Sequence, residues 1–283
     1  MSAAQSSVPR ETIMFGKIVF CLIGILASSW PATAQSRTPF KLFESLIFTG
    51  DAPDLGRLGF EHLTIADPHV LGLDVPNAEQ VQKALELPRS NQHLVVDIEQ
   101  WPLEGAYAAR ASSIAKYQAT LGAIRKADPS LKLGLYGVLP MRDYWNAIGW
   151  RGDDALRDWK SRNGEIASAL VPYVDELFPS LYTFYGDKDA WVVFARANIE
   201  EARRISQGKP VYCFLWPQFF KTFAYLPGDY WYTQLDTCRR YADGIVIWGT
   251  MTREASNRPE QWDENSEWWQ ATLRFLRELG KIP

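Results

Sequence analysis

The chain contains few of the residues that bind metal ions and no concentration of positive charge. It has three histidines and three cysteines among 283 residues, and none of them form a pair at the spacing of a zinc site. Lysine and arginine number 30 against 33 aspartate and glutamate residues, which gives a net charge of −3. A protein without a basic cluster lacks the electrostatic footprint of a nucleic acid partner. We therefore expect no metal and no nucleic acid partner.

Two familiar catalytic motifs are also missing. The first expected strand leads into the sequence FTGDAPDLG, which lacks the G-x-G-x-x-G spacing of a dinucleotide site. The chain has no G-x-S-x-G sequence, so it lacks the nucleophile elbow of a serine hydrolase. These absences predict a protein without a cofactor.

One apolar run stands out, and it lies near the N-terminus. Residues 14–34, MFGKIVFCLIGILASSWPATA, combine Lys17, the apolar run 18–26 and a final small-residue sequence. This is the order of a secretory signal peptide, and the run is shorter than the roughly 20 residues that a spanning helix needs. We expect cleavage before Gln35.

The predicted signal divides the chain into two parts. Residues 1–34 form the signal peptide, and the sequence leaves open whether Met1 or Met14 is the initiator. Residues 35–283 form the exported catalytic domain, secreted or periplasmic, with no stable membrane insertion after signal cleavage. Its net charge is −4, because the signal removes three charged residues, Arg10, Glu11 and Lys17. The oligomeric state is not predicted by the sequence.

Two cysteines, Cys213 and Cys238, remain in the predicted exported domain. In an oxidising compartment they would form a disulfide if their Cα atoms lie within about 7 Å. Otherwise they are buried free thiols, and the sequence leaves both alternatives open.

Short apolar runs, rich in β-branched and aromatic residues, alternate with segments of helical periodicity such as AYAARASSIAKYQATLGAIRKADP. Alternating strands and helices produce parallel sheets. No linker-like stretch divides residues 35–283, so we predict one α/β domain, a distorted TIM-like (β/α) barrel. The runs predict seven parallel strands, at 43–49, 62–67, 93–98, 132–138, 176–182, 211–216 and 244–248.

Functional residues of such a barrel gather where the strands end at their carboxyl termini. Acidic and aromatic residues stand at most of these predicted ends. The third strand, HLVVDIEQW, ends in two carboxylates, Asp97 and Glu99. Residues i and i+2 of a strand point to the same face, so both should face the barrel mouth while Ile98 faces the helices. Two like charges this close raise the pKa of one group, which suits acid catalysis near neutral pH.

The segment VVDIEQW resembles the acid pair of the hyaluronidases, which lies in a D-x-E-x-W context on a barrel strand. Further stretches resemble that family in the same order, across about residues 93–250: GLYGVLPMRDYW, LFPSLY, KPVYCFLW and ADGIVIWG. The resemblance implies a seven-stranded barrel and a retaining glycosidase that acts on polysaccharide or oligosaccharide. In this mechanism the substrate's acetamido group replaces an enzyme nucleophile, an exception to the usual two-carboxylate scheme.

The resemblance also implies roles for individual residues. Glu99 would donate the proton to the glycosidic oxygen, Asp97 would orient the N-acetyl group, and Tyr182 would hydrogen-bond it. Trp248 would form the floor of the sugar site, and Trp216, or less favourably Phe214, would face the substrate. Further substrate-binding candidates are Tyr136, Tyr185 and Asp143.

Two departures from the family pattern restrict the substrate. The animal enzymes read W-R-P after the acid pair, and that arginine is expected to meet the uronic acid of hyaluronan. This chain has Pro102 directly after Trp101, which argues against hyaluronan and for a less charged polymer that contains N-acetylhexosamine. The cysteine-rich C-terminal module of the animal proteins is also missing.

Two alternatives remain open at this point. A muramidase-like enzyme acting on cell wall would use a similar acid pair on a barrel. A non-catalytic barrel that binds carbohydrate would explain the departures from the family pattern.

Overall fold

The computed structural model describes residues 39–249 and 259–283. The predicted signal peptide, both candidate initiators and the predicted cleavage site lie outside these ranges. Within them, every helix is too short or too polar to cross a membrane.

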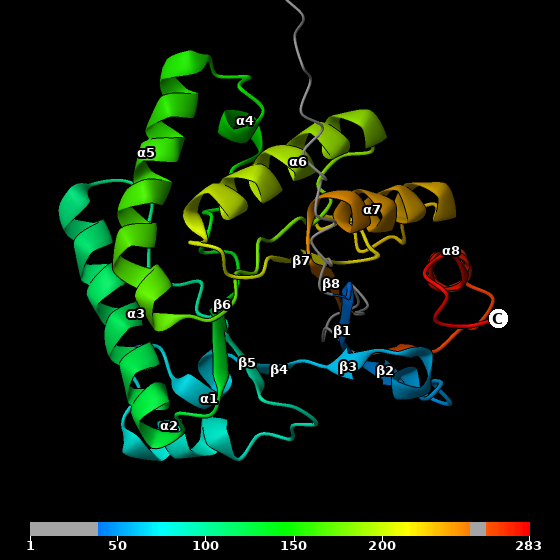
Figure 1. Ribbon diagram of the computed structural model, residues 1–283, viewed down its shortest axis with the longest axis horizontal. Coiled ribbons are helices and arrows are strands. Elements are labelled where there is room, and N and C mark those ends of the chain that lie inside the picture. Colours follow the sequence, from blue (N-terminus) through cyan, green and yellow to red (C-terminus); the bar gives the residue numbers. More distant parts are fainter. Residues whose placement is uncertain (1–38, 250–258) are drawn as a thin grey trace, which may run out of the picture. The chain divides into compact units, whose positions relative to one another are not determined.

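The strands follow one another in a parallel ring (Figure 1). Two groups of strands form most of the ring. One has four strands, in the order β3, β1, β8 and β7, and the other has three, in the order β4, β5 and β6. Their bounds are β1 Lys41–Leu46, β3 Glu61–His62, β4 Thr64–Ala66, β5 His93–Val96, β6 Lys132–Leu135, β7 Tyr212–Leu215 and β8 Gly244–Gly249. Because β3 and β4 are separated by one residue, together they form the second strand of the ring and join its two parts.

The ring closes between β6 and β7 through an extended segment that is not a regular strand. Isolated parallel bridges join Tyr136 to Phe178 on one side and Ser180 to Phe214 on the other. Pro179 lies inside this segment, and because proline has no N–H to donate, it interrupts a regular ladder. The predicted barrel fold is therefore confirmed, and its fifth strand is reduced to bridges.

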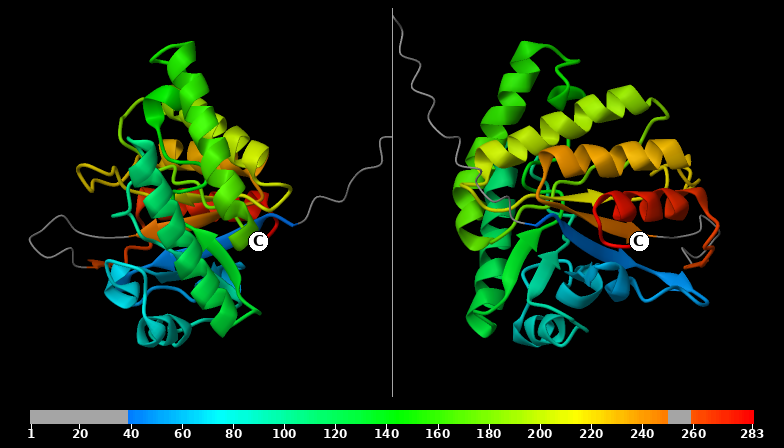
Figure 2. Two further views of the ribbon diagram at one scale, coloured as in Figure 1. Left: turned by 90° about the vertical axis from the view of Figure 1, so that its left-hand side faces the viewer. Right: turned by 45° about the vertical axis from the view of Figure 1, so that its right-hand side comes forward.

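Helices cover the outside of the ring, and α6, α7 and α8 lie next to one another (Figures 1 and 2). The helices are α1 Pro68–Leu71, α2 Ala78–Leu85, α3 Tyr107–Ala127, α4 Tyr144–Ala147, α5 Asp153–Leu170, α6 Lys188–Ile205, α7 Gly228–Tyr241 and α8 Glu267–Glu278. Short 3-10 helices occupy Leu55–Leu58 and Val171–Tyr173, and a small parallel pair joins β2 (Phe48–Thr49) to β9 (Glu260–Gln261).

Alternation along the strands separates the barrel interior from the helix layer. On β5, Leu94 and Val96 belong to the cluster that packs against α2, α3 and α5, whereas Val95 belongs to the inner cluster. Every strand position contributes to that inner cluster, whose members are Phe43, Leu63, Val95, Tyr136, Phe178, Tyr182, Tyr212, Phe214, Trp216 and Val246. The interior is thus a packed core, as barrels of this size require.

The end of the barrel where the strands begin is closed by a buried polar pair. His93, the first residue of β5, bonds through Nδ1 to a carboxylate oxygen of Glu176 at 2.8 Å, and Phe43 packs edge-on against its ring. Above this pair the ring of Phe178 fits against Gly134, where a Cβ would lie 2.2 Å from the ring. Access to the interior is therefore from the opposite end, where the strands finish.

Both cysteines of the predicted exported domain are free and fully buried, Cys213 on β7 and Cys238 on α7. Burial and a hydrogen bond between the two thiols raise the pKa of Cys238. Of the two alternatives left open by the sequence, the structure has the free thiols.

Candidate active site

The segment that follows β5 is anchored to the helix layer on both sides of Glu99. The carbonyl of Ile98 accepts a hydrogen bond of 2.5 Å from the hydroxyl of Tyr117 on α3. Trp101 packs edge-on against the Tyr117 ring, with 5.0 Å between ring centroids, and its indole N–H donates to the carbonyl of Leu73. These contacts turn Ile98 outward, and Asp97 and Glu99 face the opposite side.

Asp97 is the more enclosed of the two acids. Its Oδ1 atom is buried and has no hydrogen-bond partner among the described residues. Burial raises the pKa of Asp97 to about 7, and the negative charges of Glu99 and Asp67 add to the effect. Asp67 is the residue directly after β4, where its carboxylate caps α1. In the free protein Asp97 therefore retains its proton up to near neutral pH.

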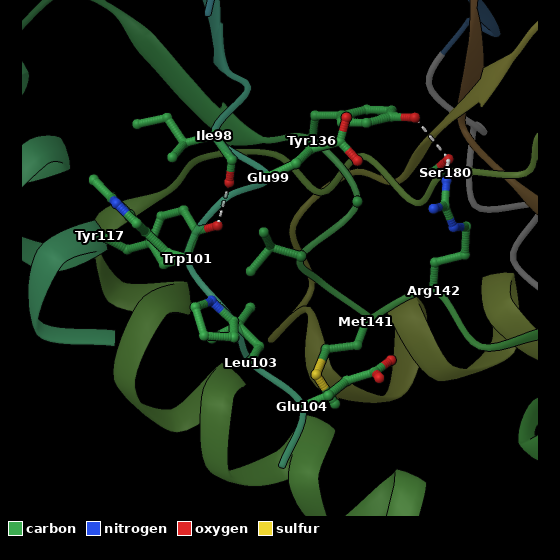
Figure 3. A pocket seen from close by; sticks show the side chains of 13 residues that line it. Ile98, Glu99, Trp101, Leu103, Glu104, Tyr117, Tyr136, Met141, Arg142 and Ser180 are labelled. Atoms are coloured by element: carbon green, nitrogen blue, oxygen red, sulfur yellow. Dashed lines mark hydrogen bonds between the residues drawn. The ribbon is translucent and has the colours of Figure 1, made fainter. Parts of the chain in front are cut away.

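Glu99 is exposed and lies between two cavities. The larger cavity, of about 410 Å³, opens over the aromatic end of the barrel interior and contains Asp97. The smaller one, of about 290 Å³, lies on the side of α3 and is lined by Trp101, Met141 and Arg142 among others (Figure 3). Glu99 and Tyr136 line both cavities. A chain that occupies both spaces would therefore pass the carboxyl group of Glu99.

Three aromatic rings form the wall of the larger cavity opposite the acids. Tyr182 and Trp248 are stacked, with centroids 5.6 Å apart and planes 24° apart. Trp216 meets both rings at an angle, at 5.4 Å from Tyr182 and 5.2 Å from Trp248. Its indole N–H donates to the side-chain oxygen of Gln218 at 2.8 Å. Gly249 leaves room for this indole, because a Cβ there would lie 2.6 Å from it.

A chain of hydroxyl groups connects the two cavities. The hydroxyl of Tyr182 is hydrogen-bonded to that of Tyr136, which in turn contacts the hydroxyl of Ser180 at 2.9 Å (Figure 3). The guanidinium group of Arg142 lies 3.4 Å from the same Ser180 oxygen. Burial raises the pKa of Tyr182 well above its ordinary value. Tyr182 is therefore a neutral hydroxyl group, able to donate a hydrogen bond.

Most of the residues that the sequence suggested lie together. The larger cavity contains Asp97, Glu99, Tyr136, Tyr182, Phe214, Trp216 and Trp248. Two candidates line neither cavity. The Asp143 carboxylate accepts hydrogen bonds from the backbone and side-chain nitrogens of Asn146 as the N-cap of α4. Tyr185 packs against Tyr144 and Trp145 outside the cavity.

Several lining residues were not among the sequence candidates. Ser180 stands two positions before Tyr182 in an extended segment, so the period of two indicates that both face inward. Arg142, Phe220 and Phe223 lie on loops, where no periodicity indicates a direction. Asp67 lines neither cavity, but its charge raises the pKa of Asp97. This effect can be foreseen only when it is known which strand lies beside β5.

The described residues contain no group of three histidine, cysteine, aspartate or glutamate side chains that could hold a metal ion. The carboxyl groups of the site can transfer protons, and its hydroxyl groups and aromatic faces can position a ligand.

No protein-family model matches the chain. No curated protein matches it either. Among solved structures, bee venom hyaluronidase is 14% identical with a TM-score of 0.58, over 85% of this chain and 97% of that one. A putative α-L-fucosidase from Bacteroides thetaiotaomicron is 12% identical with a TM-score of 0.49, over 96% and 100% of the two chains. A GH18 chitinase from Pseudoalteromonas aurantia is 12% identical with a TM-score of 0.42, over 69% and 64%. The first of these similarities shows that the chain has the fold of a known barrel protein.

Proposed function

We propose that the protein is a retaining glycosidase that cleaves a polysaccharide containing N-acetylhexosamine, with the substrate's acetamido group as the nucleophile. The observation that carries this proposal is the position of Glu99 between two cavities, with Asp97 enclosed on one side of it and its buried Oδ1 left without a partner among the described residues. The fold shared with bee venom hyaluronidase supports it, since that protein is by name a glycosidase of the expected class.

Glu99 serves as the general acid in this proposal. The reacting sugar occupies the larger cavity and the leaving sugar the smaller one, so the glycosidic oxygen lies beside the Glu99 carboxyl group. When the substrate is bound, the proton that Asp97 holds in the free protein has moved to Glu99, and it passes from Glu99 to the glycosidic oxygen as the bond to the anomeric carbon breaks. The remaining carboxylate then takes a proton from the water that attacks the same carbon.

The acetamido group requires two partners, and Asp97 and Tyr182 have the right chemistry for them. The carbonyl oxygen of the acetamido group attacks the anomeric carbon and forms a cyclic intermediate. The nitrogen of the acetamido group becomes positively charged in this intermediate. The unpartnered Oδ1 of Asp97 accepts from this N–H, and the Asp97 carboxylate balances the charge. The neutral hydroxyl of Tyr182 donates to the carbonyl oxygen and orients it. Water then opens the cycle on the opposite face, so the configuration is retained.

The aromatic wall serves to hold the sugar ring. Trp248 is half-buried and stacked on Tyr182, so one face of its indole remains available to the cavity. Aromatic faces bind the C–H side of a sugar ring without removing its hydroxyl groups from solvent. Trp216 and Phe214 complete the wall below it.

The smaller cavity bears on the identity of the polymer. Pro102 forms part of its lining, at the position where the resembling family carries an arginine. Without that cation, a uronic acid loses one expected partner. We therefore propose a polymer that is less charged than hyaluronan.

The experiment that tests this proposal measures reducing ends released from a panel of polymers. The panel contains glycol chitin, hyaluronan, purified peptidoglycan and a fully de-N-acetylated chitosan. Release from an N-acetylated polymer, with none from the de-N-acetylated one and with retained anomeric configuration by NMR, is the expected result. Equal cleavage of chitin and its de-N-acetylated form would contradict acetamido participation, and muropeptide release alone would indicate the muramidase-like alternative.

We also propose that the protein is exported to the periplasm or secreted, on the strength of the signal-like sequence at 14–34. Fractionation of the cells that express the full chain, followed by N-terminal sequencing, tests this. Recovery outside the cytoplasm with Gln35 as first residue is expected, and an intact N-terminus in the cytoplasm would contradict it.

A further inference from the structure

A row of aromatic rings leads away from the larger cavity along the loops at the open end of the barrel. Phe220 lines the cavity and lies 6.4 Å from Tyr182, measured between ring centroids. The row continues over four more rings, and the successive centroid distances are 4.7 Å from Phe220 to Phe184, 6.5 Å to Tyr185, 5.6 Å to Trp145 and 5.7 Å to Trp150. We call these five residues, Phe220, Phe184, Tyr185, Trp145 and Trp150, the aromatic track.

The aromatic track is unusually exposed for residues of this type. Trp150 is 75% exposed, and Tyr185 and Phe220 are each 38% exposed. Other tryptophans of the chain, such as Trp159 and Trp191, are almost fully buried. A large exposed apolar side chain alone requires no explanation, but a connected patch that begins at a cavity marks an interaction site.

The middle of the track packs against the helix layer. Tyr144, on α4, packs against Tyr185 at 5.1 Å and against Phe194 of α6 at 4.9 Å. The carboxylate of Asp143 caps α4 through two hydrogen bonds to Asn146. Asp143 thus acts as a positioning residue for the helix that carries Trp145. Trp145 and Tyr185 are therefore held in place by contacts with the helices.

Two cations flank the rings. The guanidinium of Arg142 lies over Phe184 and Phe220, at 5.2 and 5.7 Å from their centroids, and the ammonium of Lys221 lies 5.5 Å from the Tyr185 ring. Such contacts hold a cation beside a ring. The track thus offers aromatic faces with hydrogen-bond donors next to them, which is the combination that a sugar chain with apolar C–H faces and hydroxyl groups can use.

We propose that the aromatic track binds sugars of the substrate chain that lie beyond the reacting one. A glycan fits the track better than a protein does, because the track begins in the cavity that would hold the reacting sugar. This inference therefore rests on the proposed function. Phe220 belongs to that cavity and is absent from the lining of the smaller one. The protein therefore prefers long chains over short oligomers.

The test compares Trp150→Ala with Tyr107→Ala. Tyr107, at the start of α3, is 70% exposed and lies outside the track, so it controls for the loss of an exposed aromatic residue. Both variants should fold, because both side chains are largely in solvent. The substrates are the polymer that the panel above identifies and a graded series of oligomers cut from it.

We expect Trp150→Ala to lower kcat/KM on the polymer by about tenfold, because one stacking contact with the chain is lost. The change should appear as a higher KM with kcat unchanged. On the shortest oligomer that is cleaved, the same variant should equal the wild type, and Tyr107→Ala should equal it on both. A Trp150→Ala enzyme with unchanged chain-length preference would overturn the inference and leave the proposed function intact.

A binding measurement separates the two proposals if no polymer is cleaved. Retardation of the wild type in native gels that contain glycol chitin or hyaluronan, lost in Trp150→Ala and kept in Tyr107→Ala, would support the track in a protein that lacks the proposed activity. Equal retardation of all three proteins, or of none, would overturn it.

Discussion

Asp97 and Glu99 project from the same side of one strand end, but the pKa that is raised, to about 7, is that of Asp97. Glu99 is exposed at the boundary of two cavities, whereas Asp97 lies deeper, with a buried oxygen that has no partner among the described residues. In the proposed reaction the two acids therefore have different roles: the outer one meets the glycosidic bond, and the inner one meets the acetamido group. The negative charge of Glu99 contributes to the raised pKa of Asp97.

The first prediction concerns the pH dependence of kcat/KM. In the proposed reaction the proton for the leaving oxygen is the one that Asp97 holds in the free protein, and Asp97 keeps it up to about pH 7 because burial and the charges of Glu99 and Asp67 oppose its ionisation. Activity should therefore fall by about tenfold per pH unit above pH 7. In Asp67→Asn this fall should begin at lower pH, since one of the opposing charges is gone.

The matched control for that prediction is Asp54→Asn. Both aspartates are N-cap residues, Asp67 of α1 and Asp54 of the 3-10 helix Leu55–Leu58, and asparagine caps equally well. Asp54→Asn should keep the wild-type profile. If kcat/KM of Asp67→Asn began to fall at the same pH as that of the wild type, the fall would not be due to ionisation of Asp97.

The second prediction concerns stability and needs no substrate. An unfolded aspartate has a pKa of about 3.9, and the folded value is about 7, so the folded state holds the proton more tightly. Stability should therefore decrease as pH rises between these two values, by on the order of 4 kcal/mol at most. Asp97→Asn removes the ionisation and should raise the free energy of unfolding at about pH 8, relative to the wild type.

Chemical denaturation at about pH 8 and about pH 4 checks this second prediction. At the lower pH the two proteins should differ little, because Asp97 is then neutral in the folded state. If Asp97→Asn were no more stable than the wild type at the higher pH, the carboxyl group could not be enclosed as described.

The sequence predicted the parts of this site that depend on alternation along a strand. Asp97 and Glu99 share a face because they are two residues apart, and the neighbouring Ile98 faces the helices. The same rule places Trp216, directly after β7, and Trp248, on β8, inside the barrel. Alternating strands and helices were sufficient to predict the parallel barrel.

What the sequence could not predict depends on contacts between distant segments. The raised pKa of Asp97 arises from its burial and from the charges of Glu99 and of Asp67, which directly follows the neighbouring strand β4. Arg142 and Phe220 come from loops whose conformation has no periodic signal. Asp143 resembled a ligand-binding residue by position, but its carboxylate bonds to Asn146 in a helix cap. The predicted fifth strand became a set of bridges, since Pro179 interrupts its ladder.

The third prediction concerns Tyr182. Its hydroxyl is expected to orient the acetamido carbonyl in the transition state, so Tyr182→Phe should lower kcat by roughly tenfold to a hundredfold with little change in KM. Tyr212→Phe is the control, because Tyr212 also lies in the barrel interior and belongs to the same cluster without lining either cavity. Equal loss of kcat in both variants would indicate a packing effect and not a role in the reaction.

The central claim is that Glu99 delivers the proton to the glycosidic oxygen, and Glu99→Gln tests it most directly. Glutamine keeps the size of the side chain and removes the proton, and Glu86→Gln, at the exposed end of α2, is the control. The measurement is the rate at which reducing ends are released from the N-acetylated polymer that the wild type cleaves. The account predicts that Glu99→Gln loses roughly a hundredfold to ten-thousandfold in kcat while still binding the polymer, with Glu86→Gln unchanged. Turnover by Glu99→Gln at the wild-type rate would contradict it.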